Sequence, residues 1–417
     1  MTAGPPGAGP GSGGPAGLGA LVPAPLIGPF VPWLPADTAP PGGVSADAWE
    51  PAGLAGARLA VKDVIDIAGV PTGSGHPALL AAARPAPAHA DAAARLLAAG
   101  ARYTGKTHTD ELAYSLGGTN AHYGAQANPA APGRLAGGSS SGTAAAVAGR
   151  LADIGLGTDT AGSIRVPASY CGLYGLRPTH RRADRTGMAP LAPSFDTPGL
   201  LTRTLPLLAA GAAALLDGSG EDGPPRRLLV PADLWACAAD QVRAVLRPRA
   251  DGLGRALGLR PDPAPLFDAG APVAHGRALE LFSLVQAAEV WRAHGPWVRR
   301  ERPSFGPNVA ARLARAERIS PREEDAARAD VARVRGWLAR RLDGAVLVVP
   351  ATPTAAPRWG AAASGDRSAL LGLTCVAGLG GLPAVALPAG SPLPVGLCVL
   401  GPPGSDEALL SVAALVP

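Results

Sequence analysis

Two glycine- and serine-rich stretches decide the interpretation of this chain: residues 137–149 read GGSSSGTAAAVAG, and residues 157–172 read GTDTAGSIRVPASYCG. The first runs from paired glycines into alanines, which favours a buried helix over residues 140–150 with a serine in its first turn. The second places small residues before Ser163, where a further helical turn begins. Ser139 and Ser163 therefore lie 24 positions apart in one small-residue segment.

The backbone around the second serine is suited to stabilising negative charge. The N–H groups of Thr160, Ala161, Gly162 and Ser163 are consecutive and could converge on one oxygen. An oxyanion hole needs such donors, held in advance where charge develops in a transition state. A serine that merely caps a helix is the commoner case, so this segment alone does not establish catalysis.

Lysine is the second informative residue type, because the chain contains only Lys62, in AVKDVIDIAG, and Lys106, in GKT. A lysine can act as a base when burial lowers its pKa from about 10.4, whereas arginine does not deprotonate in proteins. Lys62 is thus a candidate base for a serine nucleophile. The alternative is a surface lysine paired with Asp63 or Asp66. We expect Lys106 to be structural, at the end of a strand.

Other interpretations of these stretches fit less well. A phosphate-binding loop would require G-x-x-x-x-G-K-[ST], and no lysine lies in residues 137–149. The pattern Gly-x-Ser-x-Gly occurs around Ser140, but LAGG before it is a poor strand for a nucleophile elbow. None of the seven histidines lies in a recognisable triad motif, and we expect His108, His122 and His180 to pack or hydrogen-bond. A serine–lysine mechanism remains.

Composition excludes several classes of function. The 417 residues carry a net charge of +5, and the basic residues are spread along the chain, which disfavours a nucleic-acid-binding face. The four cysteines have no CxxC spacing, so neither a zinc site nor a disulfide framework is predicted, and Cys171 is expected to be a buried small residue. The longest apolar run, 205–216, is too short to span a membrane. With no secretory signal, we expect a cytoplasmic protein.

Short strands and helices alternate along most of the chain, which predicts an α/β fold with a parallel or mixed sheet covered by helices. Residues 1–45 are rich in Gly, Pro and Ala and are expected to be partly disordered; residues 46–417 would form one large domain. Within it, residues 275–342 are predicted to be helical and to cover the sheet. The remaining elements are predicted as strands at 57–64, 101–104, 153–157 and in AVLVVPATP, LPAVALPAG and LPVGLCVLG, and helices at 88–99 and in SDEALLSVAALV, the last with an N-cap.

The two serine stretches with their 24-residue spacing, together with the upstream VKD, resemble the amidase signature family. The resemblance covers roughly residues 54–417. Further segments resemble this family: GKTHTDELAYSLGGTNAHYG, NPAAPGRLAGGSSSG, APLAPSFDTPG, VVPATPTAAP and LTCVAGLGGLPAVALP. The segments NAHYG, SYCGLYGLRPTH and APSFDT are most similar to short amidases acting on small amides, including the indoleacetamide-hydrolase-like group.

The resemblance implies a role for each matching position. Ser163 matches the nucleophile, Lys62 the general base, and Ser139 the bridging serine after a cis peptide, which also contacts substrate. Residues Thr160 to Ser163 match the oxyanion-hole backbone, and Ala113 matches a position lining the acyl side of the pocket. The family requires no metal or cofactor, and its members are often dimers, which suggests a homodimer by analogy.

Two residues depart from the family pattern. Ala161 stands where glycine is common, and it keeps the N–H donor while losing the freedom of glycine at positive φ. Arg181 follows Pro178-Thr179-His180, where glycine is usual, so the loop 181–187 could differ in shape. We expect both to leave the catalytic assignment intact.

The leading hypothesis is therefore an amidase that hydrolyses the C–N bond of a small carboxamide through a seryl acyl-enzyme. Neither nucleic acid nor a membrane is expected as a partner. The first alternative is the transamidating subunit of a glutamine-dependent tRNA amidotransferase, which would use the same residues with partner subunits. The second is a non-catalytic binding protein, which the presence of all three of Lys62, Ser139 and Ser163 disfavours.

Overall fold

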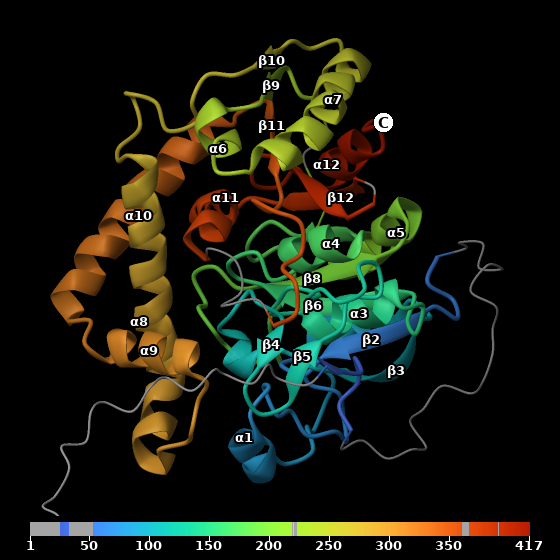
Figure 1. Cartoon of the computed structure of the whole chain (residues 1–417), viewed down its shortest axis with the longest axis vertical. Coiled ribbons are helices and arrows are strands. Elements are labelled where there is room, and N and C mark those ends of the chain that lie inside the picture. The colour runs from blue at the N-terminus through green and yellow to red at the C-terminus, as the bar shows by residue number, and fades with distance from the viewer. Residues whose placement is uncertain (1–25, 33–52, 219, 221–222, 361–366, 391) are drawn as a thin grey trace, which may run out of the picture.

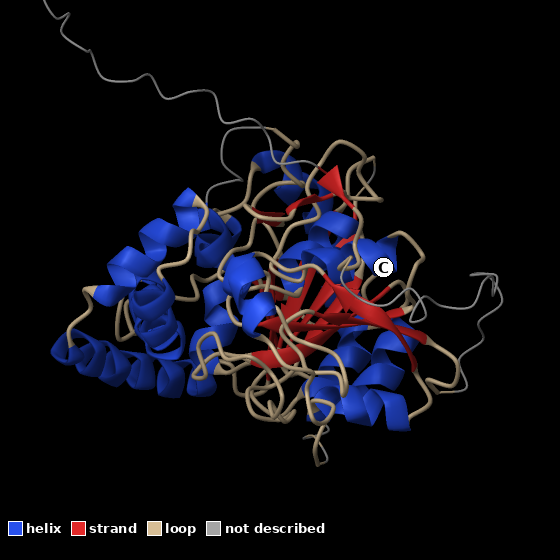
Figure 2. Ribbon diagram, turned by 90° about the horizontal axis from the view of Figure 1, so that it is seen from below, coloured by secondary structure: helices blue, strands red, loops and turns tan. Residues whose placement is uncertain are grey.

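The structure is a computed structural model that describes residues 26–32, 53–218, 220, 223–360, 367–390 and 392–417. Most of the predicted N-terminal segment, 1–45, lies outside these residues. The predicted α/β class is confirmed: one large mixed sheet carries helices on both faces (Figures 1 and 2).

Ten strands form this sheet, in the order β10-β9-β11-β13-β12-β7-β8-β6-β2-β3. Three strands at each edge are parallel to one another, and the central strands are antiparallel. The strands are β2 (Arg58–Lys62), β3 (Arg102–Thr107), β6 (Ile154–Asp159), β7 (Tyr174–Arg177), β8 (Thr197–Thr202), β9 (Arg227–Leu229), β10 (Pro261–Asp262), β11 (Ala345–Pro350), β12 (Ala384–Ala389) and β13 (Val395–Leu400). A second sheet contains β1 (Leu26–Ile27), β4 (Thr119–Asn120) and β5 (Gly124–Gln126).

Each face of the large sheet is buried under its own helices. Helices α3 (Ser141–Ala148) and α4 (Arg165–Cys171) pack on one face, and α5 (Leu205–Leu215), α7 (Asp240–Leu257) and α12 (Asp406–Ala413) pack on the other, with α2 (Asp91–Ala98) against α5. Strand β2 follows this division, because Leu59 and Val61 enter the core beneath α2, α5, α7 and α12 while Ala60 packs with α3 and α4. Side chains alternate along a strand, so Lys62 emerges on the α3 and α4 side.

The predicted helical region, 275–342, comprises α8 (His275–Glu301), α9 (Pro307–Glu317) and α10 (Pro321–Arg341). These helices form an arm beside the sheet (Figure 1). They do not cover the sheet as expected: among the described residues, α8 packs chiefly on α9, α10 and α11 (Arg367–Gly380), and α10 packs chiefly on α8 and α11. Their apolar faces are therefore buried by helices rather than by strands.

Most predicted elements are confirmed, with boundaries that shift by a few residues. The strand expected at 101–104 extends to Thr107, and the helix expected from residue 88 begins at Asp91. Ser405 occupies the N-cap position of α12 as expected, but its hydroxyl donates to the carbonyl of Pro402 at 2.7 Å and makes no side-chain cap bond. The remaining short helices are α1 (Pro77–Ala82), η2 (Glu111–Ala113) and α6 (Ala232–Trp235).

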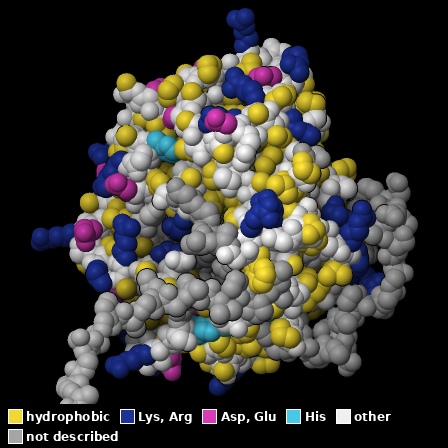
Figure 3. Space-filling model, in the orientation of Figure 1, with side chains coloured by type: hydrophobic (Ala, Val, Ile, Leu, Met, Phe, Trp, Pro, Cys, Tyr) yellow, Lys and Arg dark blue, Asp and Glu magenta, His cyan; other side chains and the backbone are white. Residues whose placement is uncertain are grey.

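Two surface properties concern the predicted partner classes. Among the described residues, no helix combines the length and the apolar sequence needed to cross a membrane. On the face drawn in Figure 3, Lys and Arg side chains are scattered among other side chains rather than gathered in one patch.

Candidate active site

The three residues predicted to carry the chemistry meet at one edge of the sheet. Lys62 is the last residue of β2, and Ser163 follows the neighbouring parallel strand β6. Parallel strands end at the same edge of a sheet, where loops commonly form binding crevices. Ser139 enters from the loop before α3, which packs on both β2 and β6. All three side chains are buried.

These side chains form a continuous chain of hydrogen bonds. The Lys62 Nζ donates to Ser139 Oγ at 2.8 Å, and Ser139 Oγ lies 2.9 Å from Ser163 Oγ. Because a hydroxyl both donates and accepts, Ser139 can pass a proton between Ser163 and Lys62. The Gly138–Ser139 peptide is cis, as expected from the family pattern. The arrangement can therefore activate a serine oxygen without histidine.

Burial makes Lys62 a base near neutral pH. Removal from water lowers its pKa from 10.5 to about 7, against the attraction of Asp110, Asp159 and Asp196, which raises it. The alternative of a surface lysine paired with Asp63 or Asp66 is wrong, since the Lys62 side chain is 0% exposed. Asp63 instead pairs with Lys106, whose Nζ lies 3.3 Å from the carboxylate.

Thr158 is a contact that the sequence analysis missed. Its hydroxyl accepts from Lys62 Nζ at 2.8 Å, so the ammonium is held between two hydroxyl groups and contacts no carboxylate of the described residues within ion-pair distance. Thr158 lies one residue from the quoted Asp159, inside the GTDTAGS stretch. The contact could have been predicted only from the knowledge that β6 ends beside the end of β2, and this knowledge requires the order of the strands in the sheet.

The carboxylate of Asp110 packs against Gly138, the first residue of the cis peptide. Its carboxylate accepts from the Gly118 N–H at 3.1 Å, and a Cβ at Gly138 would lie 2.5 Å from one of its oxygens. Only glycine fits between this carboxylate and the backbone. Burial raises the pKa of Asp110 to about 6, although Gly118 and Lys62 act to lower it. Asp110 is thus a second group near Lys62 that titrates close to neutral pH.

Asp159 organises the loop that carries Ser163. Its carboxylate accepts from the N–H groups of Gly162 and Ile164 and from the buried Arg165 at 2.9 and 3.0 Å. Arg177 adds a contact at 3.1 Å. Burial raises the pKa of this carboxyl, but the charge of Arg165 outweighs that effect and holds the pKa well below its ordinary range. A paired buried carboxylate with these donors fixes the loop geometry.

The four predicted oxyanion donors are not equivalent. The Gly162 N–H donates to Asp159 at 3.0 Å, which leaves Thr160, Ala161 and Ser163 as the other candidates. Thr160 is held by its side chain, which donates to Asp196 at 2.6 Å. Ala161 does not adopt positive φ, whereas Gly162 has φ +115° and packs against Thr374. The alanine therefore occupies a position that does not require glycine.

The other two positions singled out in the sequence lie in nearby loops. Ala113 ends η2, three residues after Asp110, and is buried. Arg181 has φ +71°, a left-handed conformation that favours glycine, so the arginine retains the backbone shape expected of the usual residue. His180 Nε2 donates to the carbonyl of Pro193 at 3.0 Å, and Cys171 is buried, as predicted.

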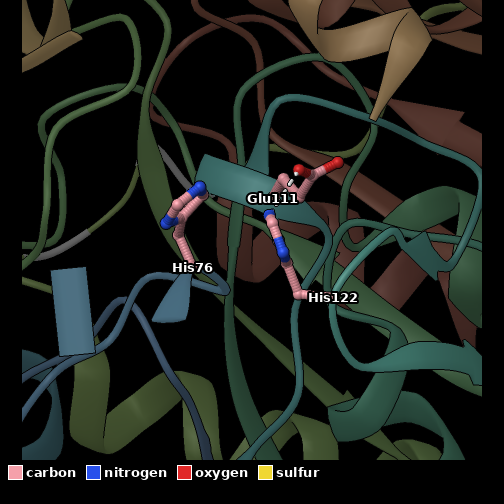
Figure 4. A group of neighbouring side chains, drawn as sticks. All are labelled: His76, Glu111 and His122. Atoms are coloured by element: carbon pink, nitrogen blue, oxygen red, sulfur yellow. Dashed lines mark ion pairs between the residues drawn. The ribbon is translucent and has the colours of Figure 1, made fainter. Parts of the chain in front are cut away.

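One cluster has the donor types of a metal site: His76, Glu111 and His122 (Figure 4). His122 Nε2 lies 3.2 Å from Glu111, whose carboxylate also accepts from the Gly306 N–H. His76 Nδ1, however, accepts from the Ala78 N–H, so its proton sits on Nε2, 2.9 Å from the carbonyl of Ser304. A histidine that binds a metal through one nitrogen normally donates from the other. The cluster therefore fits a contact between the core and the loop after α8 better than a metal centre.

Comparisons with known proteins point to the same class of enzyme as the geometry of the site. The family model described as Amidase matches residues 44–219. The chain is 34% identical over 393 residues to "Amidase 1" of Arabidopsis thaliana, covering 87% of this chain and 92% of that protein. It is 32% identical over 406 residues to a glutamyl-tRNA(Gln) amidotransferase subunit of Akkermansia muciniphila, covering 86% of this chain and 85% of that protein. A crystal structure described as that of an amidase superposes with a TM-score of 0.77 at 31% identity, covering 87% of this chain and 84% of the other.

Proposed function

This chain belongs to the amidase family, and we propose that it cleaves the C–N bond of small carboxamides through an acyl-enzyme on Ser163. The observation that carries the proposal is the unbroken relay from Lys62 through Ser139 to Ser163, with contacts of 2.8 and 2.9 Å. The low pKa of Lys62 supports its role as the base.

In the first half-reaction, Ser163 Oγ attacks the amide carbonyl carbon. Its proton passes to Ser139 Oγ, and the proton of Ser139 passes to neutral Lys62. The carbonyl electron pair moves to oxygen, where the N–H groups of Thr160, Ala161 and Ser163 are the candidates that stabilise it. Collapse of this intermediate breaks the C–N bond, and the relay returns a proton to the leaving nitrogen, which departs as ammonia or an amine.

In the second half-reaction, water attacks the acyl carbonyl and the same relay removes its proton. Collapse of the second intermediate breaks the bond to Ser163 Oγ, which recovers its proton, and the carboxylic acid leaves as carboxylate. Each group that acts as a base in one step thus acts as an acid in the next, and no other reactant is consumed.

A second candidate is the transamidating component of a tRNA amidotransferase, which the similarity to the bacterial amidotransferase protein favours. That function would use the same relay and would require partner subunits. The two differ in isolation, since a free-standing amidase turns over simple amides alone. Resemblance of residues 169–180 to the short amidases supports the free-standing enzyme.

The purified chain should therefore release ammonia from at least one member of a panel of aliphatic, aryl and indole amides. Glutamine with and without added amidotransferase partner subunits belongs in the same panel. Turnover of simple amides without partners would support the amidase. Turnover of glutamine only with partners would support the second candidate, and no release from any amide under either condition would contradict both.

We further expect kcat/KM to rise with pH through about 7. Lys62 must be neutral to accept a proton, and its pKa is lowered to about 7, so the active fraction falls about tenfold per pH unit below that point. The measurement is kcat/KM from pH 5 to 9 on a neutral amide. A rate that falls as the pH increases through 7 would exclude Lys62 as the base.

Asp110 provides the control for that profile, because it also titrates near pH 6. Asp110→Asn keeps an oxygen that can accept from Gly118 and removes one negative charge near Lys62. The pKa of Lys62 should then fall, moving the acidic limb to lower pH. If the limb belonged to Asp110 itself, it would vanish in this variant.

A further inference from the structure

The charges of three arginines act on Tyr114 at the junction of the arm and the core, and one of these arginines contacts it. Arg312 and Arg315 lie on α9, and Arg367 is the first residue of α11. Arg312 donates to the Tyr114 carbonyl at 2.6 Å, and its guanidinium carbon lies 5.0 Å from the centre of the Tyr114 ring. The charges of all three arginines act on the Tyr114 hydroxyl. We name Arg312, Arg315 and Arg367 the arginine cluster.

Within the part of the chain that the structure describes, the arginine cluster has no acidic partner. Among the described residues, no carboxylate lies within ion-pair distance of any of its members, whereas Arg328 pairs with Glu289 and Arg182 with Glu407. The Nε atoms of Arg312 and Arg367 are buried and have no hydrogen-bond partner within the described part of the chain. Unpaired charges at buried positions are unfavourable. Donors are thus available at this point that nothing in the described chain uses.

The arginines also disfavour one another. Burial, followed by the charge of Arg312, lowers the pKa of Arg367 to about 10. Its remaining described contact is neutral: Nη2 lies 3.4 Å from the Gln286 side-chain oxygen, on α8. An anion placed between these guanidinium groups would relieve the repulsion and satisfy the open donors together.

The two acidic groups whose charges act on Arg312 accept hydrogen bonds elsewhere. Asp110 and Glu111 act on Arg312 only through space. The Asp110 carboxylate accepts from Gly118, and the Glu111 carboxylate accepts from Gly306 at 3.0 and 3.2 Å. Neither can neutralise the arginine cluster without giving up a backbone contact.

Two short connections join the arginine cluster to the candidate active site. Tyr114 directly follows Ala113, and two residues later the Leu116 carbonyl accepts from the N–H of Gly138, next to Ser139. Along α11, Thr374 donates to the Ala161 carbonyl at 2.6 Å. Arg367 lies seven residues earlier, about 10 Å along the helix axis. It occupies the N-terminal end of a 14-residue helix, where the helix dipole also favours an anion.

We propose that the arginine cluster binds a carboxylate on the acyl part of the substrate, so that the preferred substrates are half-amides of dicarboxylic acids. This inference rests on the proposed amide hydrolysis. Arginine forks match the two oxygens of a carboxylate. The acyl side is assigned because Tyr114 adjoins Ala113, the position that the family resemblance places there.

The test compares amides that differ only in this charge. Glutaramate and adipamate carry a terminal carboxylate, and pentanamide and hexanamide are the neutral counterparts. We expect the wild-type enzyme to prefer the anionic amides in kcat/KM by about 10- to 100-fold, the range for hydrogen bonds to a charged group. Arg312→Gln and Arg367→Gln should remove most of that preference by raising KM for the anionic amides much more than KM for the neutral amides.

Arg318→Gln is the matched control, since Arg318 is an exposed arginine one residue beyond α9. It should keep the preference of the wild type. Equal kcat/KM on charged and neutral amides, with no effect of Arg312→Gln or Arg367→Gln, would overturn the inference and leave amide hydrolysis standing. Loss of preference in Arg318→Gln alone would also overturn it.

A binding measurement separates this inference from the chemistry. Ser163→Ala protein, titrated with glutarate by calorimetry, should bind it, and binding should weaken at least about tenfold when Arg367→Gln is added. If no amide is turned over yet glutarate binds in this way, the proposed function fails and the anion site stands. Absence of glutarate binding in folded protein, verified by thermal unfolding, overturns the site. Arg367→Lys retains the positive charge but lacks the paired N–H donors of the guanidinium group. This variant should bind glutarate more weakly than the protein with Arg367 but more tightly than Arg367→Gln.

Discussion

Replacing Ser163 with alanine should lower kcat/KM for any amide substrate by at least about 10⁴-fold. The substitution removes the oxygen that both contacts Ser139 and lies in the loop carrying the predicted oxyanion donors. Lys62 and Ser139 could at most activate a water molecule, which would have to attack the amide directly because no acyl-enzyme can form. The measurement is ammonia release under conditions where the wild-type rate is established.

Ser169→Ala controls for the substitution itself. Ser169 lies on α4, is also buried, and contacts Thr352 at 2.8 Å, six residues beyond Ser163. We expect it to cost about 1 kcal/mol of stability and little activity. Mass spectrometry of protein quenched during turnover should find the acyl group on the peptide containing Ser163. An active Ser163→Ala enzyme, or an acyl group on another residue, would contradict the proposed nucleophile.

The sequence predicted the members of the candidate relay because they lie in long motifs of small residues. The family pattern identifies Ser139 by the two glycines before it, Gly137 and Gly138. It identifies Ser163 by its spacing from Ser139, so few other serines could match these two positions. The strands expected at 57–64, 101–104 and 153–157 and the helices expected at 88–99 and 140–150 were predicted from local signals in the same way, whereas α1, η2, β4, β5 and β7 were not predicted. These signals are local, and the structure places them within a few residues.

The contacts that tune the relay were not predictable in this way. Thr158 and Asp110 act on Lys62 only because β2, β6 and the loop after β3 converge, which depends on strand order. Strand β12 pairs with β7 across more than 200 residues, and no local pattern encodes such a partner. The same holds for α11, which was not predicted and whose position between the helical arm and the sheet depends on the tertiary fold.

The two lysines illustrate the difference between residue type and environment. Both are 0% exposed, but the register of the neighbouring strands pairs Lys106 with Val61, so the two lysine side chains leave opposite faces of the sheet. Lys106 reaches Asp63, so its charge is paired, whereas Lys62 reaches two hydroxyl groups. The unpaired lysine is the one that can release its proton near neutral pH, and composition alone could not distinguish them.

Lys62→Arg should reduce kcat/KM by about 10³-fold or more, with the charge retained. Arginine is larger and stays protonated at every accessible pH, so it cannot accept the proton that Ser139 passes on. General acid–base catalysis is worth about 10²- to 10⁴-fold, and the relay has no alternative base among the described residues that contact it. The residual activity should also lose the rise with pH through about 7.

Lys62→Ala separates loss of the base from damage to the site. It leaves a space where Lys62 stood, so methylamine in the buffer should restore part of the activity, with a pH dependence that follows the amine. Lys62→Arg should show no rescue, because its side chain fills that space. Both variants should unfold at temperatures near that of the wild type, since neither breaks an ion pair. Wild-type rates in Lys62→Arg would contradict the assignment of Lys62 as the general base. Rescue of Lys62→Ala by amines, in proportion to the concentration of their neutral form, would show that the reaction needs a nitrogen lone pair beside Ser139.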